Sequence, residues 1–325
     1  MRVIKVMLAN NKTTAELGVQ FDVLPEVHSF PLEIAKDQLV TLDCLRLDKV
    51  HPFISGNKWY KLKHHLLAAV AAGKSQIVSF GGAHSNHLHA LAYAANQLNL
   101  DSVGIVRGEP HGDLTPTLQD CEKWGMKIQW LDRETYRHTA SNTTPDMYKE
   151  AMPEAWVVPE GGAGRQGTLG IESLFNTLHH AGQLNYDLIA CAVGSGATLA
   201  GIAQANIGRA QCVGFSALKN AHDLEHRVER QLSGASRVNP WRICHHYHFG
   251  GFAKINSRLT EFISDVYDEH GLVLDPVYTG KMMYGLAEYI HQGRIQAGAR
   301  VLAVHTGGLQ GWRGFGESYQ RFLSS

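Results

Sequence analysis

The sequence has no long hydrophobic run, no C-x-x-C cysteine pair and no excess of charge of either sign. No run approaches the roughly 18 apolar residues of a membrane-spanning helix, so we expect no membrane span. The segment Met1–Met7 lacks the apolar region and cleavage site of a signal peptide. Thirty basic residues balance thirty acidic ones, which argues against a nucleic-acid or anionic-membrane partner. A small molecule is the favoured partner.

The few cysteines point to a reducing compartment. There are five, an odd number, and they are widely spaced. Such spacing predicts reduced thiols in a cytoplasmic protein, buried as small apolar side chains, and not a disulfide framework. They are Cys44, Cys121, Cys191, Cys212 and Cys244.

The length of 325 residues, with 44% hydrophobic and 18% charged residues, predicts a soluble globular protein with two domains or one large α/β unit. We expect residues 1–37 to form an arm that packs over the rest of the protein. Apolar and polar residues alternate over 38–47, which predicts a half-buried strand. We expect a small domain at about 61–156, inserted in a large domain made of 1–60 and 157–325.

From residue 76 onward, short apolar strands alternate with helical patterns, which predicts mostly parallel sheets with helices on both faces. The expected strands are 76–80, 102–106, 127–131, 187–193, 211–216 and 300–305, and residues 156–164 are expected to cross between the domains. The expected helices are 58–72, 86–98, 114–124, 166–181, 198–203, 221–232, 256–270 and 279–292. The polar stretch 132–147 and the aromatic- and histidine-rich stretch 241–253 are not assigned to an element.

Three expected strands end in glycine-rich turns with Ser or Thr, at 81–86, 194–198 and 306–308. Open α/β sheets bind ligands at the carboxyl ends of their strands, and a glycine turn before a helix offers backbone N–H groups to an anion. The turn Gly194-Ser195-Gly196-Ala197-Thr198 favours a monophosphate over a pyrophosphate. The plainer alternative is a tight turn that needs glycine for packing.

Lys58 stands at the start of an expected helix, directly after Gly56-Asn57. A cation there opposes the helix dipole, which suggests a role beyond solvation. Lysine is also the side chain that forms Schiff bases with carbonyl compounds such as pyridoxal phosphate. We predict that Lys61 and Lys63 are solvated charges on the same helix.

The nineteen histidines raise the question of a metal, and we expect none. Zinc sites need three or four converging ligands, whereas His87 and His89 would point apart on a helix. His84 lies inside the first glycine turn and is a candidate for ligand contact.

The segment Asp275–Lys281 opens another expected helix. The segment could be only a capped helix with Thr279 as its cap, and Tyr278 could equally reach into a cleft. Thr306 either closes a turn or donates a hydrogen bond to a ring nitrogen.

Together these motifs resemble those of the D-cysteine desulfhydrases and the related 1-aminocyclopropane-1-carboxylate (ACC) deaminases, over roughly residues 38–310. The motifs occur in the same order as in those enzymes: Ser55-Gly-Asn-Lys-x-x-Lys-Leu62, Gly81-Gly-x-x-Ser-Asn86, Gly194–Thr198, Asp275–Lys281 and His305–Gly308. Both groups are pyridoxal-phosphate (PLP) enzymes of the tryptophan-synthase-β-like fold, fold type II. The resemblance implies a two-domain, three-layer α/β fold with open, twisted, mostly parallel sheets, and a homodimer.

The resemblance also implies roles for individual residues. Lys58 would carry the Schiff base to PLP, Asn86 would bond its 3-oxygen, and Thr306 would face its ring nitrogen. A neutral threonine there would make the ring a weaker electron sink than an Asp-paired ring, which suits elimination better than transamination. The turn 194–198 would hold the phosphate.

The substrate side follows from the same resemblance. Ser85, with the backbone N–H groups of Asn86 and His87, would hold the substrate carboxylate. Tyr278 would exchange protons near the reacting carbon, with Thr279 beside it on the cofactor side.

Three positions bear on which reaction is implied. Thr279 matches the desulfhydrases, where ACC deaminases have Glu. His84 stands where both groups usually have Gln. Phe252 stands in the place of a Tyr in both groups, so both positions are candidates for substrate contact.

The implied activity is deamination of a small amino acid, by α,β-elimination or ring opening, which yields ammonia and a 2-oxo acid. Two alternatives stay open. One is a homologue that binds PLP or an amino acid with altered catalysis. The other is a nucleotide-binding α/β protein, which rests only on the turn 194–198.

Overall fold

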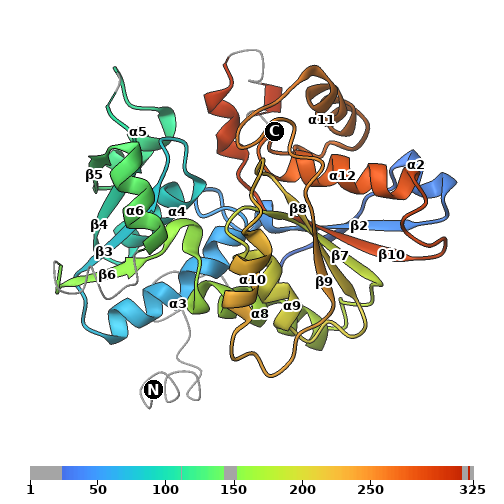
Figure 1. Ribbon diagram of the computed structural model, residues 1–325, viewed down its shortest axis with the longest axis horizontal. Helices are drawn as coiled ribbons and strands as arrows, with labels where there is room; N and C mark the ends of the chain where they lie inside the picture. The colour runs from blue at the N-terminus through green and yellow to red at the C-terminus, as the bar shows by residue number, and fades with distance from the viewer. Residues whose placement is uncertain (1–23, 111, 143–151, 317–320, 323–325) are drawn as a thin grey trace.

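The computed structural model describes residues 24–110, 112–142, 152–316 and 321–322. Two twisted sheets with helices packed on them lie side by side, joined by the long helices α3 (Asn57–Ala71) and α8 (Arg165–His180) (Figure 1). Only β1 is antiparallel to its neighbour among the paired strands described. The expected α/β fold with mostly parallel sheets is confirmed.

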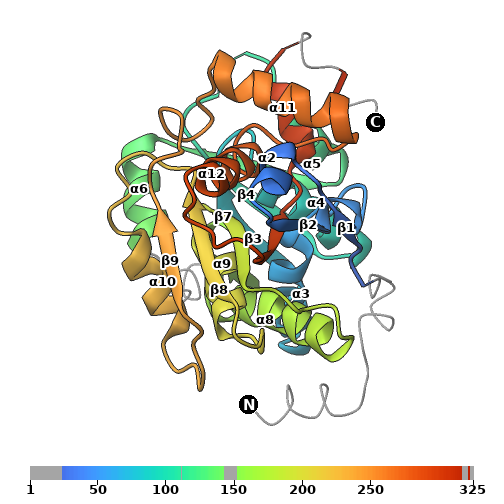
Figure 2. The ribbon, with the colours of Figure 1, turned by 90° about the vertical axis from the view of Figure 1, so that its right-hand side faces the viewer.

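The larger sheet has six strands in the order β1-β2-β10-β7-β8-β9. Its strands are β1 (Val27–Ser29), β2 (Thr41–Arg46), β7 (Leu188–Val193), β8 (Gln211–Ser216), β9 (Trp241–Cys244) and β10 (Arg300–His305). Both faces are covered, as Figure 2 shows. The helices are α2 (Glu33–Asp37), α8, α9 (Ala197–Gln204), α10 (Leu224–Leu232), α11 (Ser257–His270) and α12 (Thr279–His291).

The apolar run of β7 explains why this sheet is buried on both sides. Successive side chains of a strand point to opposite faces. Ile189 and Cys191 pack in the cluster with α8 and α9. Ala190 and Ala192 pack in the cluster with α11 and α12. A strand buried on both faces reads as a continuous apolar run, the pattern typical of parallel sheets.

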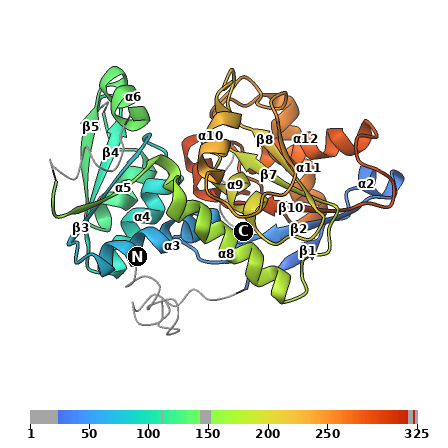
Figure 3. The ribbon, with the colours of Figure 1, turned by 60° about the horizontal axis from the view of Figure 1, so that its bottom comes forward.

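The smaller sheet has four parallel strands in the order β5-β4-β3-β6 (Figure 3). Its strands are β3 (Gln76–Gly81), β4 (Asp101–Arg107), β5 (Met126–Leu131) and β6 (Ala155–Val158). Its helices are α4 (Asn86–Gln97), α5 (Pro116–Lys123) and α6 (Arg133–Asn142). Val78 and Phe80 of β3 pack with Tyr136 of α6, whereas Ile77 belongs to the cluster of α4.

Several stretches contain elements that the sequence did not assign, among them the histidine-rich stretch 241–253, which begins with β9. The polar stretch 132–147 contains helix α6, whose N-terminus is held by Asp132: its carboxylate accepts hydrogen bonds from the N–H groups of Glu134 and Thr135 at 3.0 Å. The arm 1–37 contributes β1 to the sheet edge and α2 to its face; residues 1–23 and 143–147 lie outside the described residues. The strand expected at 38–47 is confirmed as β2.

The division into domains stays a proposal. We propose that the four-stranded sheet and its helices form the small domain at 61–156, although β6 ends at Val158. Among the described residues, no helix is both long enough and apolar enough to cross a bilayer.

Candidate active site

The start of α3 is tightly packed against the end of β10. Gly56 caps the helix with φ of +73°, and a Cβ at this position would overlap the carbonyl oxygen of Thr306. The N–H of Asn57 donates to that same oxygen at 3.2 Å. Only glycine combines a positive φ with so close an approach of two backbones. The motif Ser55–Lys58 is therefore fixed on the turn 306–308.

The turn 194–198 joins the same assembly. Asn57, which is 6% exposed, donates its Nδ2 hydrogen bond to Oγ1 of Thr198 at 2.8 Å. The turn is supported from behind by Gln231, whose Nε2 donates to the carbonyl oxygen of Ser195 at 3.0 Å. At its front, a Cβ on Gly194 would lie 3.0 Å from Cε1 of Tyr278. Tyr278 thus lies directly against the turn.

The third glycine turn comes from the other sheet. Ser85 is the N-cap of α4, and its Oγ accepts from the N–H of Leu88 at 3.2 Å, as serine N-caps do. A Cβ at Gly308 would lie 2.6 Å from Nδ2 of Asn86. Oδ1 of Asn86 is buried and has no hydrogen-bond partner among the described residues. The three predicted turns therefore meet around the start of α3.

Lys58 lies at this junction and is partly buried. Burial lowers the pKa of its amine to about 8, against the opposing pull of the Asp275 carboxylate. Among the described residues its amine has no hydrogen-bond acceptor or ion-pair partner. Because only the neutral amine carries a lone pair, a lowered pKa makes this lysine a better nucleophile at neutral pH.

Lys61 corrects the prediction of a solvated charge. It is only 3% exposed, and burial together with the charge of Lys58 lowers its pKa well below the ordinary value. The cause is α8, which crosses α3: a Cβ at Gly167 would lie 3.7 Å from Cβ of Lys61. Lys63 on the same helix is only partly buried.

His87 follows Asn86 and is 2% exposed. Its Nε2 lies 2.8 Å from Oγ of Ser79, which donates its own proton to the carbonyl oxygen of Val158 at 2.7 Å. Nε2 must therefore carry the ring proton, and Nδ1 is a buried acceptor without a partner among the described residues. Burial and the nearby Lys58 amine lower the pKa of His87 well below its ordinary value, so the ring is neutral.

The start of α12 is held by Asp275, which is 1% exposed. Its carboxylate accepts from the N–H groups of Tyr278 at 2.8 Å and Thr279 at 2.7 Å. The Thr279 hydroxyl also donates to this carboxylate. The carboxylate of Asp275 therefore caps α12, and the interpretation of Thr279 as the cap was wrong. The pKa of Tyr278 is raised mainly by burial and further by the carboxylates of Asp275 and Glu160. Its phenol therefore keeps its proton.

Phe252 and His84 lie at the border of this region. The Phe252 ring is 47% exposed and its centroid is 6.0 Å from that of Tyr278. His84 is exposed and lies close to the backbone of Gly314, where a Cβ would approach its Nδ1 to 3.0 Å. His87 and His89 do point apart, because His89 bonds Asp120 at 3.1 Å. Among the described residues, no group of three or more metal-ligating side chains could hold a metal ion.

These groups fit a cofactor with an aldehyde and a phosphate. The aldehyde finds a lysine amine of lowered pKa at residue 58. The phosphate finds a glycine turn at the N-terminus of α9, where free N–H groups and the helix dipole favour an anion. The buried amide of Asn86 has unused hydrogen-bonding capacity for a ring substituent.

Two mostly parallel α/β sheets with a lysine amine between three glycine turns fit a PLP-dependent enzyme. The family model described as "Pyridoxal-phosphate dependent enzyme" matches residues 36–307, and the chain belongs to this family. Its cofactor is therefore PLP.

Among curated proteins, the chain is 32% identical over 284 residues to a "Putative 1-aminocyclopropane-1-carboxylate deaminase" of Pyrococcus abyssi, covering 83% of this chain and 85% of the relative. It is also 32% identical over 281 residues to the "Bifunctional D-cysteine desulfhydrase/1-aminocyclopropane-1-carboxylate deaminase, mitochondrial" of Arabidopsis thaliana, covering 79% and 70%.

Solved structures agree on the fold. The crystal structure of an "ACC deaminase homologue" superposes with a TM-score of 0.80 at 26% identity, covering 96% of this chain and 99% of the other. A threonine deaminase isoform of Solanum lycopersicum reaches 0.64 at 13% identity, covering 88% and 79%. The fold is the tryptophan-synthase-β-like one of fold type II, as the resemblance implied.

Three residues of the site were not predicted as such. Asn57 stands inside the lysine motif, and its position next to Lys58 is a signal that could have singled it out. Asp275 opens the Asp-Pro-Val-Tyr segment, where a carboxylate before a helix is a common capping signal. Lys61 gave no such signal, because it becomes buried only when α8 packs over α3.

Proposed function

We propose that this enzyme deaminates a small amino acid by α,β-elimination or ring opening and releases ammonia and a 2-oxo acid. The observation that carries the proposal is the Lys58 amine, with a pKa lowered to about 8, at the meeting point of three glycine turns. The names of its relatives, which refer to ACC and D-cysteine, support these two compounds as the first substrates to test.

The contacts at the site and the resemblance to the desulfhydrases support the residues that would hold the cofactor. Lys58 would bind its aldehyde carbon covalently, and Asn86 would bond the ring oxygen. The turn Gly194–Thr198 would hold the phosphate. Thr306 would face the ring nitrogen, and Thr279 would act through Asp275, to which it donates. When bound, PLP supplies an electron-withdrawing ring that stabilises negative charge at the substrate α-carbon.

The substrate carboxylate would lie at the N-terminus of α4. Ser85 offers its hydroxyl there, and the N–H groups of Asn86 and His87 belong to the first turn of a helix of twelve residues. Such N–H groups have no partner within the helix and bind anions well. His84 and Phe252 would border the substrate side chain.

Proton transfer would fall to two groups. With a pKa of about 8, the Lys58 amine is neutral over a useful pH range and could take the α-proton of a substrate. Tyr278 keeps its phenolic proton, because its pKa is raised, and lies against Gly194 at the edge of the phosphate turn. It can therefore donate a proton to a leaving group or a product carbon.

A second function has one observation in its favour. Phe252, which packs against Tyr278, has no hydroxyl and cannot exchange a proton. A protein that binds PLP and an amino acid without turnover is therefore the alternative. Incubation with D-cysteine, L-cysteine, D-serine and ACC separates the two: a change in cofactor absorbance without keto acid from a broad amino-acid panel would favour the binder.

The test of the cofactor assignment is Lys58→Ala. We expect the absorbance of the covalently bound cofactor to vanish and turnover to fall by about a thousandfold or more, as when a covalent catalyst is removed. Lys63→Ala, on the same helix, is the control and should keep both. A Lys58→Ala protein with the full absorbance band and full turnover would overturn the proposal.

We also propose a cytoplasmic location and a homodimer. All five cysteines are free and buried, which suits a reducing compartment. The dimer rests on the resemblance to the desulfhydrases and ACC deaminases, and light scattering on the purified enzyme would test it.

A further inference from the structure

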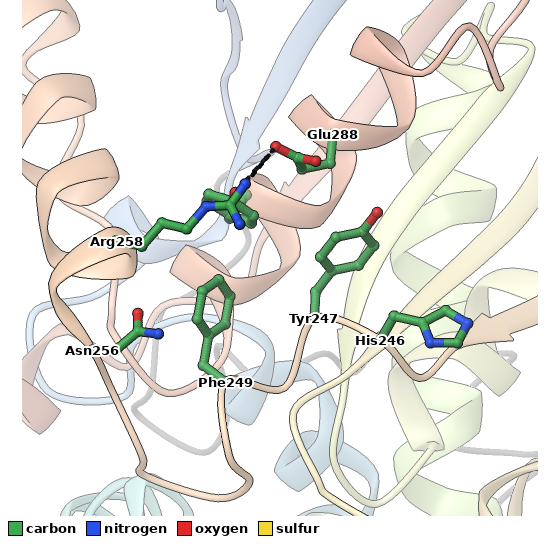
Figure 4. A pocket seen from close by; sticks show the side chains of 7 residues that line it. His246, Tyr247, Phe249, Asn256, Arg258 and Glu288 are labelled. Carbon is green, nitrogen blue, oxygen red and sulfur yellow. Dashed lines mark hydrogen bonds and ion pairs between the residues drawn. The ribbon is translucent and has the colours of Figure 1, made fainter.

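The segment 245–254, which connects β9 to α11, lies along one face of α12. Residues three or four apart share a face of a helix, and Tyr278, Lys281, Tyr284 and Glu288 follow this spacing from the start of α12. Figure 4 shows Tyr247 and Phe249 of the segment beside this helix, at a cavity of about 270 Å³.

Aromatic side chains anchor the first half of the segment. The Phe249 ring meets that of Tyr284 edge-on, with centroids 5.0 Å apart. The ring centroid of Tyr247 lies 6.2 Å from that of Tyr284. Gly285 makes room for it, since a Cβ there would lie 2.8 Å from Cδ2 of Tyr247.

The backbone of the segment is held in costly conformations. Phe249 and Ala253 have φ of +51° and +54°. Non-glycine residues rarely adopt this region, because their side chains then crowd the backbone. Contacts from outside the segment must therefore hold it in place.

Lys281 provides such contacts in the second half. Its side chain is 1% exposed, and its Nζ donates to the carbonyl oxygens of His248 at 2.9 Å and Gly251 at 2.6 Å. No carboxylate lies within ion-pair distance of this amine among the described residues. The carbonyl groups of the segment are thus the partners that satisfy a buried cation, and a buried cation is costly without them.

Phe252 follows Gly251 directly. Although 47% exposed, its ring faces that of Tyr278, one turn before Lys281, at an interplanar angle of 66°. The carbonyl oxygen of Gly251 accepts a hydrogen bond from Lys281, which fixes the backbone next to Phe252. This hydrogen bond therefore sets where the Phe252 ring lies relative to Tyr278.

We propose that Lys281 is a positioning residue for substrate binding: it fixes the segment 248–251 so that Phe252 forms an apolar wall beside Tyr278. The proposal rests on the proposed function, because it takes Tyr278 to face the reacting amino acid. Such a wall suits a small substrate side chain with an uncharged, apolar edge.

The experiment compares Lys281→Met, which keeps the length of the side chain and removes its donors, with Lys254→Met as the control on an exposed lysine of the same segment. We expect Lys281→Met to keep its PLP content, to raise KM about tenfold with kcat little changed, and to speed amide hydrogen exchange in 245–254. An effect of this size is typical of a lost pocket contact. Lys254→Met should match the wild type.

A second variant keeps the test meaningful if Lys281→Met folds poorly. Phe252→Leu removes the ring without disturbing the buried amine and should raise KM by a similar factor. The KM of the double variant should be no higher than that of either single variant, because both substitutions act on the same apolar wall. Unchanged KM and exchange in Lys281→Met, or additive effects in the double variant, would overturn the proposal. Failure of the cofactor assignment appears separately, as cofactor retained by Lys58→Ala.

Discussion

Two lysines near helix starts, Lys58 and Lys281, share one electrostatic feature and differ in everything around it. Burial lowers the pKa of each amine to about 8, and the Asp275 carboxylate opposes it in both cases. The Lys281 amine donates to two carbonyl groups, whereas the Lys58 amine has no such acceptor in the described part of the chain. A lowered pKa therefore does not by itself identify a reactive lysine. At Lys58 it coincides with an amine that has no acceptor in the described part of the chain and lies where three glycine turns meet.

The largest difference is expected in turnover. Lys58→Met should abolish the covalent attachment of PLP and lower kcat by about a thousandfold or more, while Lys281→Met should change kcat by less than roughly threefold. Steady-state kinetics and cofactor absorbance on both variants measure this. Equal losses of kcat in the two variants would contradict the distinction between a reactive Lys58 and a positioning Lys281.

The backbone under Lys58 gives the next effect. Gly56→Ala forces a Cβ into the Thr306 carbonyl at a positive φ, and we expect a loss of about 3 kcal/mol in the free energy of unfolding. The control is Gly73→Ala, where φ is +66° but nothing lies within 4 Å of the added Cβ, so about 1 kcal/mol is expected. Chemical denaturation measures both, and a Gly56→Ala protein as stable as Gly73→Ala would contradict the packing.

A smaller effect should come from the link between the lysine motif and the phosphate turn. Asn57→Ala removes the donor to Thr198 and leaves the buried Thr198 hydroxyl without this partner, so we expect PLP affinity to fall about tenfold. Gln97→Ala, on the exposed end of α4, is a neutral control. Equilibrium titration of the apoprotein with PLP measures it, and unchanged affinity would show that the link is dispensable.

The smallest effect concerns pH. With an amine pKa of about 8, the neutral fraction of Lys58 rises with pH, so the loading rate of the apoprotein should increase about fivefold from pH 7 to pH 8 and level off above pH 9. The sign follows because the protonated amine has no lone pair. Lys281→Met should show the same profile, although Lys281 has a similar pKa. If Lys281→Met lost this pH dependence, the loading profile would belong to Lys281 and not to Lys58.

The sequence allowed much of the fold to be predicted because its signals are local. The continuous apolar run of β7 and the strand-turn-helix order around Gly194–Thr198 each depend on neighbouring residues alone, and both agree with the structure. Lys58 was singled out for a local reason as well, its place at a helix start.

What sequence could not provide depends on residues far apart in the chain. Lys61 is buried by α8, which lies more than a hundred residues later in the chain. Its position in the helical pattern therefore led to the wrong prediction of a solvated charge. The acceptors of Lys281 are carbonyl groups about 30 residues earlier, in a stretch without periodicity. The helix α6 was missed because its sequence is polar, and only Tyr136 of its described side chains is buried.

The most direct measurement is to reduce the PLP-loaded enzyme with borohydride, digest it and locate the modified peptide by mass spectrometry. Our account places the pyridoxyl mass on Lys58 alone, with Lys61 and Lys281 unmodified. A label on either of these lysines, or no stable label in a protein that has bound PLP, would contradict it.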